Sequence, residues 1–321
     1  AWRDLLQIRP PRVLEREDRP DLLDPSMPGV GVERISLDGP AGHPLEMLLA
    51  RPVGDGLPCA LVAGRAVQEN PDVLGDLRPL LEMGHAVLVC ESYRGALPDA
   101  VREWSRNEKE IWRRERASRS LRMAFHFLDG ESWSHPERRY MLGMSRGGGL
   151  ILPAAVQELG VRLLVLLVPV PWLPQGRLSQ QVPHERLDLV GSVFHLLDAN
   201  VIGPALQDMD TAVVLATEDD PGVLGGVRKI HSFLGPRSRP FRVKAGHRFP
   251  FSAAMEKGLG GWIQERLAPS WTPPARKRDI PEDVLEAKKR VLAWQAAARE
   301  ESAGQEEAGK PRDETKGPGG G

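Results

Sequence analysis

Short apolar runs alternate along the chain with longer segments in which apolar residues recur every three or four positions. The runs predict buried strands at 59–63, 86–90, 139–142, 163–168, 211–217 and 241–244. The periodic segments predict helices at 71–83, 107–128, 148–159, 221–233 and 252–267. Strands that alternate with helices in this way form a mostly parallel sheet with helices on both faces.

Two more strand-like segments, 32–37 and 45–49, come before this alternation. The first of them ends at Asp38-Gly39-Pro40, a turn sequence, and the second begins a few residues later. Strands joined by a short turn pair antiparallel, because a parallel crossover needs a longer connection. We therefore expect an eight-stranded α/β sheet that is antiparallel at one edge and parallel elsewhere.

Three stretches do not follow the alternating pattern. Residues 1–31 are rich in Pro, Arg and Asp and predict an extended N-terminal lead-in. Residues 169–210 predict a small helical excursion that lies over the sheet after the sixth strand, like a cap. Residues 268–321 predict a polar helix over 281–299 and then a Gly-, Glu- and Lys-rich tail that cannot form a core. The sequence therefore predicts one α/β domain over 32–267 with two polar ends.

The composition is that of a globular protein, and its charge is balanced. Hydrophobic residues make up 41% of the 321 residues, and 43 Lys and Arg face 44 Asp and Glu. A net charge of −1 argues against a dedicated nucleic-acid binder. We expect the arginines of the helix 107–128 to form a solvated face rather than a nucleic-acid stripe; they are Arg113, Arg114, Arg116, Arg119 and Arg122. No apolar run is long enough to span a bilayer.

The cysteines predict neither a metal site nor a disulfide. Cys59 and Cys90 both lie in apolar runs, where buried free thiols are expected. No Cys or His pair has zinc-type spacing, and we expect no metal and no cofactor. The chain begins at Ala1 rather than Met, which is compatible with a removed leader. The sequence assigns neither a compartment nor an oligomeric state.

The clearest chemical motif is Gly143-Met144-Ser145-Arg146-Gly147, which lies between a predicted strand and a predicted helix. A serine on such a strand-to-helix turn is held in a strained conformation, and the two glycines let the strand and helix pass closely. The N–H groups at the start of the helix then point to where an oxyanion would form. Ser145 is therefore the candidate nucleophile.

A serine nucleophile needs a base and an acid, which follow this type of turn in the order acid, then histidine. After the strand 211–217 come three acidic residues, Glu218, Asp219 and Asp220, so the choice among them is open at this point. After the strand 241–244 comes His247, the candidate base. The remaining histidines are expected to be structural or to lie at the surface.

On these features, residues 32 to 267 resemble an α/β-hydrolase of the dienelactone-hydrolase, acetyl-xylan-esterase and prolyl-oligopeptidase branch. The likeness includes the serine turn, Met83 to Leu88, Tyr93-Arg94-Gly95 and Ser134 to Arg138. In that family the acid lies directly before a proline, which implies Asp220 before Pro221, with Asp219 as the alternative. The resemblance also matches the Gly-His-x-Phe setting of His247.

The resemblance implies an oxyanion hole made of two backbone N–H groups. One belongs to Arg146, and the second comes from the loop after the strand 59–63, where Arg65 is the expected residue. Two positions depart from the family pattern. Ala63 stands where the family usually has His, and Thr217 stands where it usually has Gly.

The sequence predicts a serine hydrolase that cleaves small-molecule carboxylic esters through Ser145, His247 and Asp220, with an acyl-enzyme intermediate. The excursion is expected to line the substrate pocket with Trp172, Leu173 and Phe194. Two alternatives remain open. One is a non-catalytic binding protein with this fold, and the other is a peptidase or thioesterase that uses the same three residues.

Overall fold

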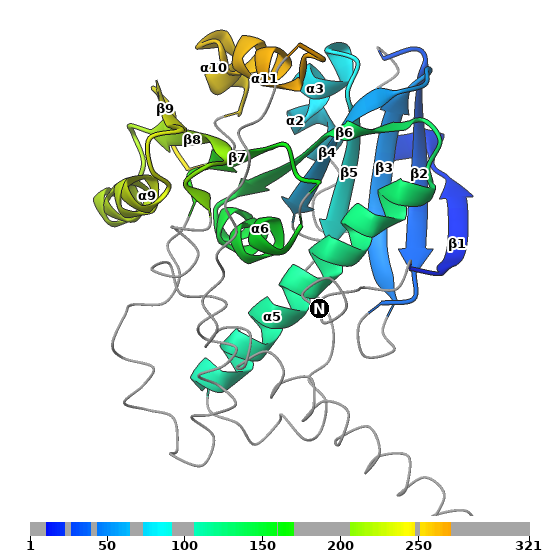
Figure 1. Ribbon diagram of the computed structural model, residues 1–321, viewed down its shortest axis with the longest axis horizontal. Helices are drawn as coiled ribbons and strands as arrows, with labels where there is room; N and C mark the ends of the chain where they lie inside the picture. Colours follow the sequence, from blue (N-terminus) through cyan, green and yellow to red (C-terminus); the bar gives the residue numbers. More distant parts are fainter. Residues whose placement is uncertain are drawn as a thin grey trace, which may run out of the picture.

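The computed structural model describes residues 11–22, 27–39, 44–64, 73–91, 106–158, 160–169, 206–247 and 251–270. Within these ranges, strands form one nine-stranded sheet in the order β1-β2-β3-β5-β4-β6-β7-β8-β9 (Figure 1). The strands are β1 (Val13–Asp18), β2 (Val30–Leu37), β3 (Leu45–Pro52), β4 (Leu57–Gly64), β5 (Ala86–Glu91), β6 (Ser134–Met144), β7 (Leu163–Leu167), β8 (Asp210–Ala216) and β9 (Ser238–Val243). The long excursion predicted over 169–210 lies outside the described residues from 170 to 205, and so does the tail from 271 onward.

The sheet is antiparallel at one edge and parallel elsewhere, as the sequence predicted. β1, β2, β3 and β5 pair antiparallel in turn. The strands from β5 through β4, β6, β7 and β8 to β9 pair parallel. The carboxyl ends of these parallel strands therefore meet at one edge of the sheet, where loops that follow different strands come together.

The sheet has one strand more than the eight that the sequence predicted. β1 lies in the segment expected to be an extended lead-in, and it forms the edge of the sheet. All six of its residues are exposed, so it lacks the apolar alternation by which a half-buried strand is detected. Arg16 of β1 pairs with Glu33 of β2 and with Glu131.

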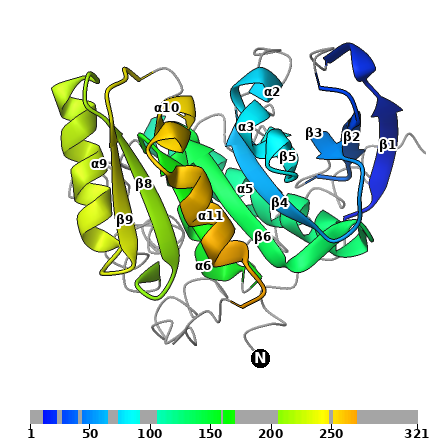
Figure 2. The same ribbon diagram turned by 90° about the horizontal axis from the view of Figure 1, so that it is seen from above.

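Helices cover both faces of the sheet (Figures 1 and 2). The short helices α2 (Val73–Asp76) and α3 (Arg78–Glu82) share one face with α10 (Phe251–Glu256) and α11 (Leu259–Leu267). The other face carries α5 (Arg106–Phe127), α6 (Arg146–Gln157) and α9 (Pro221–Phe233). Two 3-10 turns complete the described elements, η1 (Pro20–Leu22) and η3 (Leu128–Gly130).

Two segments that the sequence predicts as single helices are each divided in two. The segment 71–83 is interrupted between α2 and α3, where Pro79 in the first turn of α3 has no N–H to continue a preceding helix. The segment 252–267 is interrupted at Gly258, which has a φ of 88° and precedes α11. A left-handed residue ends the helical hydrogen-bond ladder and turns the chain.

The core consists of the central strands and the helix faces packed on them. All residues of β7 and β8 are buried, as expected for parallel strands covered on both sides. Cys59 and Cys90 are buried free thiols, which confirms the prediction. Burial raises the pKa of the Cys59 thiol to about 12, so this thiol stays protonated at neutral pH.

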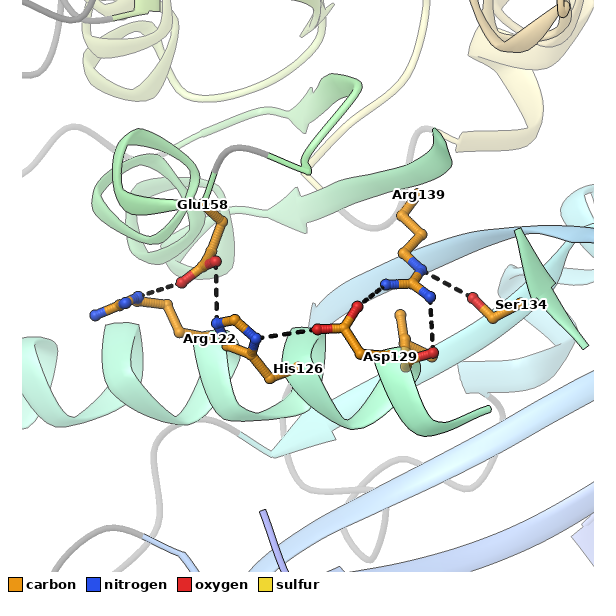
Figure 3. Close-up of polar contacts among 7 residues, drawn as sticks. Arg122, His126, Asp129, Ser134, Arg139 and Glu158 are labelled. Carbon is orange, nitrogen blue, oxygen red and sulfur yellow. Dashed lines mark hydrogen bonds and ion pairs between the residues drawn. The ribbon is translucent and has the colours of Figure 1, made fainter. Parts of the chain in front are cut away.

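A polar network joins α5 and η3 to β6 and to the end of α6 (Figure 3). Arg122 pairs with Glu158, which also lies 3.2 Å from Nε2 of His126. The other ring nitrogen of His126 lies 3.2 Å from Asp129, and Asp129 in turn pairs with Arg139. The network therefore connects four elements through alternating charges.

The expectation of a solvated arginine face on α5 is wrong for two of its arginines. Arg116 and Arg122 are both buried, at 8% and 6% exposure. Arg122 is held in place by Glu158 and by the side-chain amide of Gln157. A buried charge needs such partners. The pattern of residues along α5 does not indicate them, because Gln157 lies 35 residues further along the chain. No helix among the described residues is long and apolar enough to cross a membrane.

Candidate active site

Ser145 lies between the end of β6 and the start of α6, in a backbone conformation that a side chain rarely adopts. Its φ is 51° and its ψ is −117°. Among the described residues, only Ser145 and Val168 combine a side chain with a positive φ. Such a conformation costs about 1–3 kcal/mol and persists only where the surroundings enforce it. The turn therefore has the strained geometry that the motif predicted.

The two glycines of the motif lie where a Cβ atom would not fit. A Cβ on Gly143 would lie 2.5 Å from the carbonyl oxygen of Gly147. A Cβ on Gly147 would overlap the carbonyl oxygen of Ala63, near the end of β4. Strand β6, helix α6 and the end of β4 thus approach each other at backbone distance, and β4 ends beside Ser145.

The end of β7 supports the turn from the other side. The N–H of Ser145 donates to the carbonyl of Leu167 at 2.9 Å, and the next residue, Val168, has a φ of 40°. Val168 is fully buried, and its N–H donates to Val214 at 3.0 Å. A β-branched residue directly before Pro169 strongly disfavours this conformation. Ser145 is therefore hydrogen-bonded to the residue directly before the second strained position.

His247 follows β9 and reaches Ser145 through its ring. Its Nε2 lies 2.9 Å from Oγ of Ser145, within hydrogen-bond distance. The side chain of His247 is 40% exposed, so one side of the ring faces solvent. The structure thus brings together the two residues that the sequence proposed as nucleophile and base.

The carboxylate beside His247 belongs to Asp219. Oδ2 of Asp219 lies 2.8 Å from Nδ1 of His247, and the side chain is only 4% exposed. Its other oxygen, Oδ1, accepts a hydrogen bond from the backbone N–H of Asp220 at 2.7 Å. Both oxygens of this buried carboxylate therefore have a donor, as a buried charge requires.

The prediction that Asp220 is the acid partner of His247 is wrong in this structure. Asp220 is exposed and is the N-cap of α9, where its Oδ1 accepts from the N–H of Gly222 at 2.7 Å. The physical reason is visible in the sequence, because Pro221 occupies the first position of α9 and a residue before such a proline commonly caps the helix. Glu218, the third acid, is exposed and lies 3.9 Å from Lys244.

Backbone hydrogen bonds align the loop that carries Asp219 with the loop that carries His247. The paired strands end at Ala216 and Val243. Beyond them the N–H of Thr217 donates to Val243 at 2.9 Å, and the N–H of Glu218 donates to Ala245 at 3.0 Å. The pairing of β8 with β9 therefore continues into both loops and decides which acid meets the histidine.

Arg146 is the first residue of α6 and is exposed. The N–H groups of a first helical turn have no partner within the helix, so the N–H of Arg146 is available beside Ser145. The second expected oxyanion donor, Arg65, lies outside the described residues, as do the expected pocket residues Trp172, Leu173 and Phe194. Among the residues that the structure describes, no three His, Cys, Asp or Glu side chains could hold a metal ion.

Two other described histidines, His85 and His126, have partners of their own elsewhere in the fold. His85 is buried, with Nδ1 2.8 Å from the hydroxyl of Tyr140. Burial, with a smaller contribution from the charge of Arg138, lowers the pKa of His85 to about 4. His126 belongs to the network of Figure 3. Neither of these two contacts Ser145, whereas the ring of His247 does.

Comparison with known proteins supports the fold. No family model matches the chain, and no curated protein matches it in sequence. Solved structures do match. An acetyl xylan esterase from a Paenibacillus species is 17% identical, with a TM-score of 0.57, over 82% of this chain and 92% of that one.

Two further solved structures have the same architecture. An acetyl xylan esterase from a Thermoanaerobacterium species is 14% identical, with a TM-score of 0.54, over 83% of this chain and 92% of its own. A thermostable carboxylesterase cloned from a metagenomic library is 17% identical, with a TM-score of 0.52, over 84% and 94%. The chain therefore has the α/β-hydrolase fold.

Proposed function

We propose that the protein is a serine hydrolase that cleaves carboxylic esters through Ser145, His247 and Asp219. The observation that carries the proposal is the chain of contacts from Ser145 Oγ to His247 Nε2 at 2.9 Å and from His247 Nδ1 to Asp219 at 2.8 Å. A strained serine, a histidine and a buried carboxylate in this order are the parts that nucleophilic acyl transfer needs. The solved structures of similar fold that are named as esterases support the same reaction class.

In the proposed reaction His247 acts first as a base. Nε2 takes the proton of Ser145 as Oγ attacks the carbonyl carbon of the ester. Asp219 accepts a hydrogen bond from Nδ1, which fixes the tautomer of the ring and stabilises the imidazolium that forms. The tetrahedral intermediate carries a negative oxygen, and the N–H of Arg146 is the proposed donor to it, with Arg65 as the expected second donor.

The same histidine then acts as an acid. Its proton goes to the leaving alkoxide oxygen as the C–O bond breaks, which leaves an acyl group on Ser145. Water attacks this acyl-enzyme while His247 takes a proton from the water. The second tetrahedral intermediate then collapses to the carboxylic acid as His247 returns the proton to Oγ of Ser145. The substrate is a small-molecule ester, and Trp172, Leu173 and Phe194 remain the predicted lining of its pocket.

The test is covalent labelling combined with hydrolysis. We expect wild-type protein to react with a fluorophosphonate probe and to hydrolyse p-nitrophenyl esters, with a preference that a series from acetyl to octanoyl would reveal. Ser145→Ala is expected to abolish both. Ser238→Ala is a matched control. Ser238 is the first residue of β9, and its hydroxyl donates to the carbonyl of Gly235. Both activities are expected to remain in this variant.

Other outcomes of these assays would point to a different substrate class or to a protein without catalytic activity. A wild-type protein that is labelled but prefers thioesters or peptides would redirect the proposal to those acyl groups. A folded wild-type protein that neither labels nor hydrolyses any of these substrates would contradict the enzyme proposal and favour a binding protein with this fold.

A further inference from the structure

We propose that Thr217 is a positioning residue for His247, and that its hydroxyl holds the acid loop and the histidine loop in the register that lets Asp219 meet the ring. This inference rests on the proposed function, since it concerns the same three residues. Thr217 itself touches neither Ser145 nor His247 in any described contact, so it would act through the backbone of Val243.

Two donors of Thr217 meet at one carbonyl group. Its backbone N–H lies 2.9 Å from the carbonyl oxygen of Val243, and its Oγ1 donates to the same oxygen at 3.2 Å. Val243 is the last residue of β9, so this carbonyl lies where the strand ends and the histidine loop begins. A residue without a hydroxyl would supply only the first of these hydrogen bonds.

The hydrogen bonds close a ring around the acid and the histidine. On one side the chain runs from Thr217 through Glu218 to Asp219, and on the other from Val243 through Ala245 to His247. The Thr217–Val243 pair closes one end of this ring, the Glu218 N–H donates to Ala245 at 3.0 Å within it, and the Asp219–His247 contact of 2.8 Å closes the other end. A shift at Val243 is therefore transmitted to His247 over a short, closed path.

Among the described residues of the histidine loop, Ala245 is partly buried against the core, and its neighbours on either side are exposed. Gly246, directly before His247, is exposed, and a Cβ at this position would meet nothing within 4 Å. Lys244 is also exposed, and its ion pair with Glu218 is long, at 3.9 Å. Since exposed ion pairs contribute little, the described contacts that hold the loop in register are the packing of Ala245, the ladder hydrogen bonds and the hydroxyl of Thr217.

A structural role alone is the competing explanation, and the chain offers a matched control for it. Thr211 lies near the start of β8, the strand that Thr217 directly follows, and its hydroxyl donates to the carbonyl of Met209, also at 3.2 Å. Thr211 is fully buried whereas Thr217 is exposed, so we expect loss of the hydroxyl to lower stability more at Thr211 than at Thr217. The two threonines make the same kind of hydrogen bond, but only Thr217 is joined to the histidine loop.

The experiment compares Thr217→Val, Thr217→Ser and Thr211→Val with the wild type. Valine keeps the branched shape and removes the hydroxyl, whereas serine keeps the hydroxyl. For Thr217→Val we expect kcat/KM for p-nitrophenyl acetate to fall roughly tenfold, the order expected when the loss of one hydrogen bond lets His247 leave its reactive position. The loss should appear in kcat with KM nearly unchanged, and the rate of fluorophosphonate labelling should fall in parallel.

The controls separate positioning from stability. Thr217→Ser is expected to recover kcat to within about twofold of the wild type, and Thr211→Val to lower the melting temperature while leaving kcat unchanged. A Thr217→Val protein that is folded and has wild-type kcat would overturn the inference, as would a Thr217→Ser protein that loses as much activity as Thr217→Val.

A measurement that does not require turnover keeps this inference separate from the proposed function. The proton between His247 Nδ1 and Asp219 is expected to give a downfield NMR resonance that weakens or disappears in Thr217→Val and remains in Thr211→Val. If the wild type fails to hydrolyse esters but the resonance responds in this way, the proposed function is wrong and the positioning role holds. If the resonance is the same in both variants and the wild type, the positioning role is wrong even for an active enzyme.

Discussion

Nδ1 of His247 lies 2.8 Å from Oδ2 of Asp219, whereas the neighbouring Asp220 turns its carboxylate to the first turn of α9. Two adjacent residues of the same type therefore have different partners. The difference arises because Asp219 is nearly buried between two donors, and Asp220 is exposed before a proline.

This division predicts opposite results for the two aspartates. Asp219→Asn should lower kcat on the order of 10³–10⁴-fold, because an amide no longer stabilises the imidazolium or its correct tautomer. Asp220→Asn should leave kcat near the wild-type value, since asparagine is an equally good N-cap. Steady-state hydrolysis of p-nitrophenyl acetate by both variants checks this. A larger loss in Asp220→Asn than in Asp219→Asn would contradict the assignment of Asp219.

The backbone contact between Gly147 and Ala63 predicts that Gly147→Ala loses activity. The added methyl group would overlap the carbonyl oxygen of Ala63, so α6 must move away from β4 and take Ser145 with it. We expect a fall in kcat/KM of at least about 100-fold, the scale of a displacement of roughly 1 Å at a reacting group. Gly225→Ala in α9 is the matched control.

A methyl group added at Gly225 would meet no neighbouring atom within 4 Å, so alanine fits there without a clash. In a helix interior this change should stabilise the protein by up to about 1 kcal/mol. Urea unfolding followed by circular dichroism, together with the ester assay, tests both variants. Equal activity in Gly147→Ala and the wild type would show that the turn tolerates the extra atom.

The buried His85 predicts that stability falls as the pH is lowered. Its pKa is about 4 in the folded protein and 6.5 when unperturbed, so the unfolded chain binds this proton first. The contribution of the neutral ring to the free energy of unfolding is therefore fully present above about pH 6.5 and is lost as the pH falls to about 4. This contribution is about 3 kcal/mol. Urea unfolding at several pH values, compared with His85→Gln, measures it. Identical pH dependence in both proteins would argue against this role.

His126 predicts the opposite sign of pH dependence. Its pKa is raised, chiefly by its hydrogen bond to Glu158 and further by Asp129, against the cost of burial. Both ring nitrogens face a carboxylate, an arrangement that only the doubly protonated ring can satisfy with two donors (Figure 3). Arg122 and Arg139 pair with the same two carboxylates and limit the effect.

Since the folded pKa of His126 lies above the unfolded one, its stabilising contribution is complete below about pH 6.5 and disappears as the pH rises through the folded pKa. The free energy of unfolding of the wild type relative to His126→Gln should therefore decrease between mildly acidic and alkaline pH. Urea unfolding from pH 6 to pH 9 checks this direction. A difference that grows with pH would show that the ring is neutral in the folded protein.

Local features account for the parts of the site that could be predicted. The glycines and the serine of residues 143–147 lie within one turn, so their geometry follows from their own sequence and from the strand and helix beside them. Helix α9 begins and ends where the apolar spacing predicted, at 221 and 233. In contrast, β1 has no apolar pattern, and it is a strand only because β2 lies beside it.

The sequence by itself determined the alternation of strands and helices from β4 onward, the strained serine turn and the histidine that follows the last strand, because these depend on neighbours a few residues away. Only the tertiary structure decided that Asp219 rather than Asp220 meets His247. That choice depends on the register between two loops of different strands, in which the Glu218 N–H pairs with Ala245 and the Thr217 N–H with Val243. No pattern within either loop contains this register, since it arises when β8 and β9 pair.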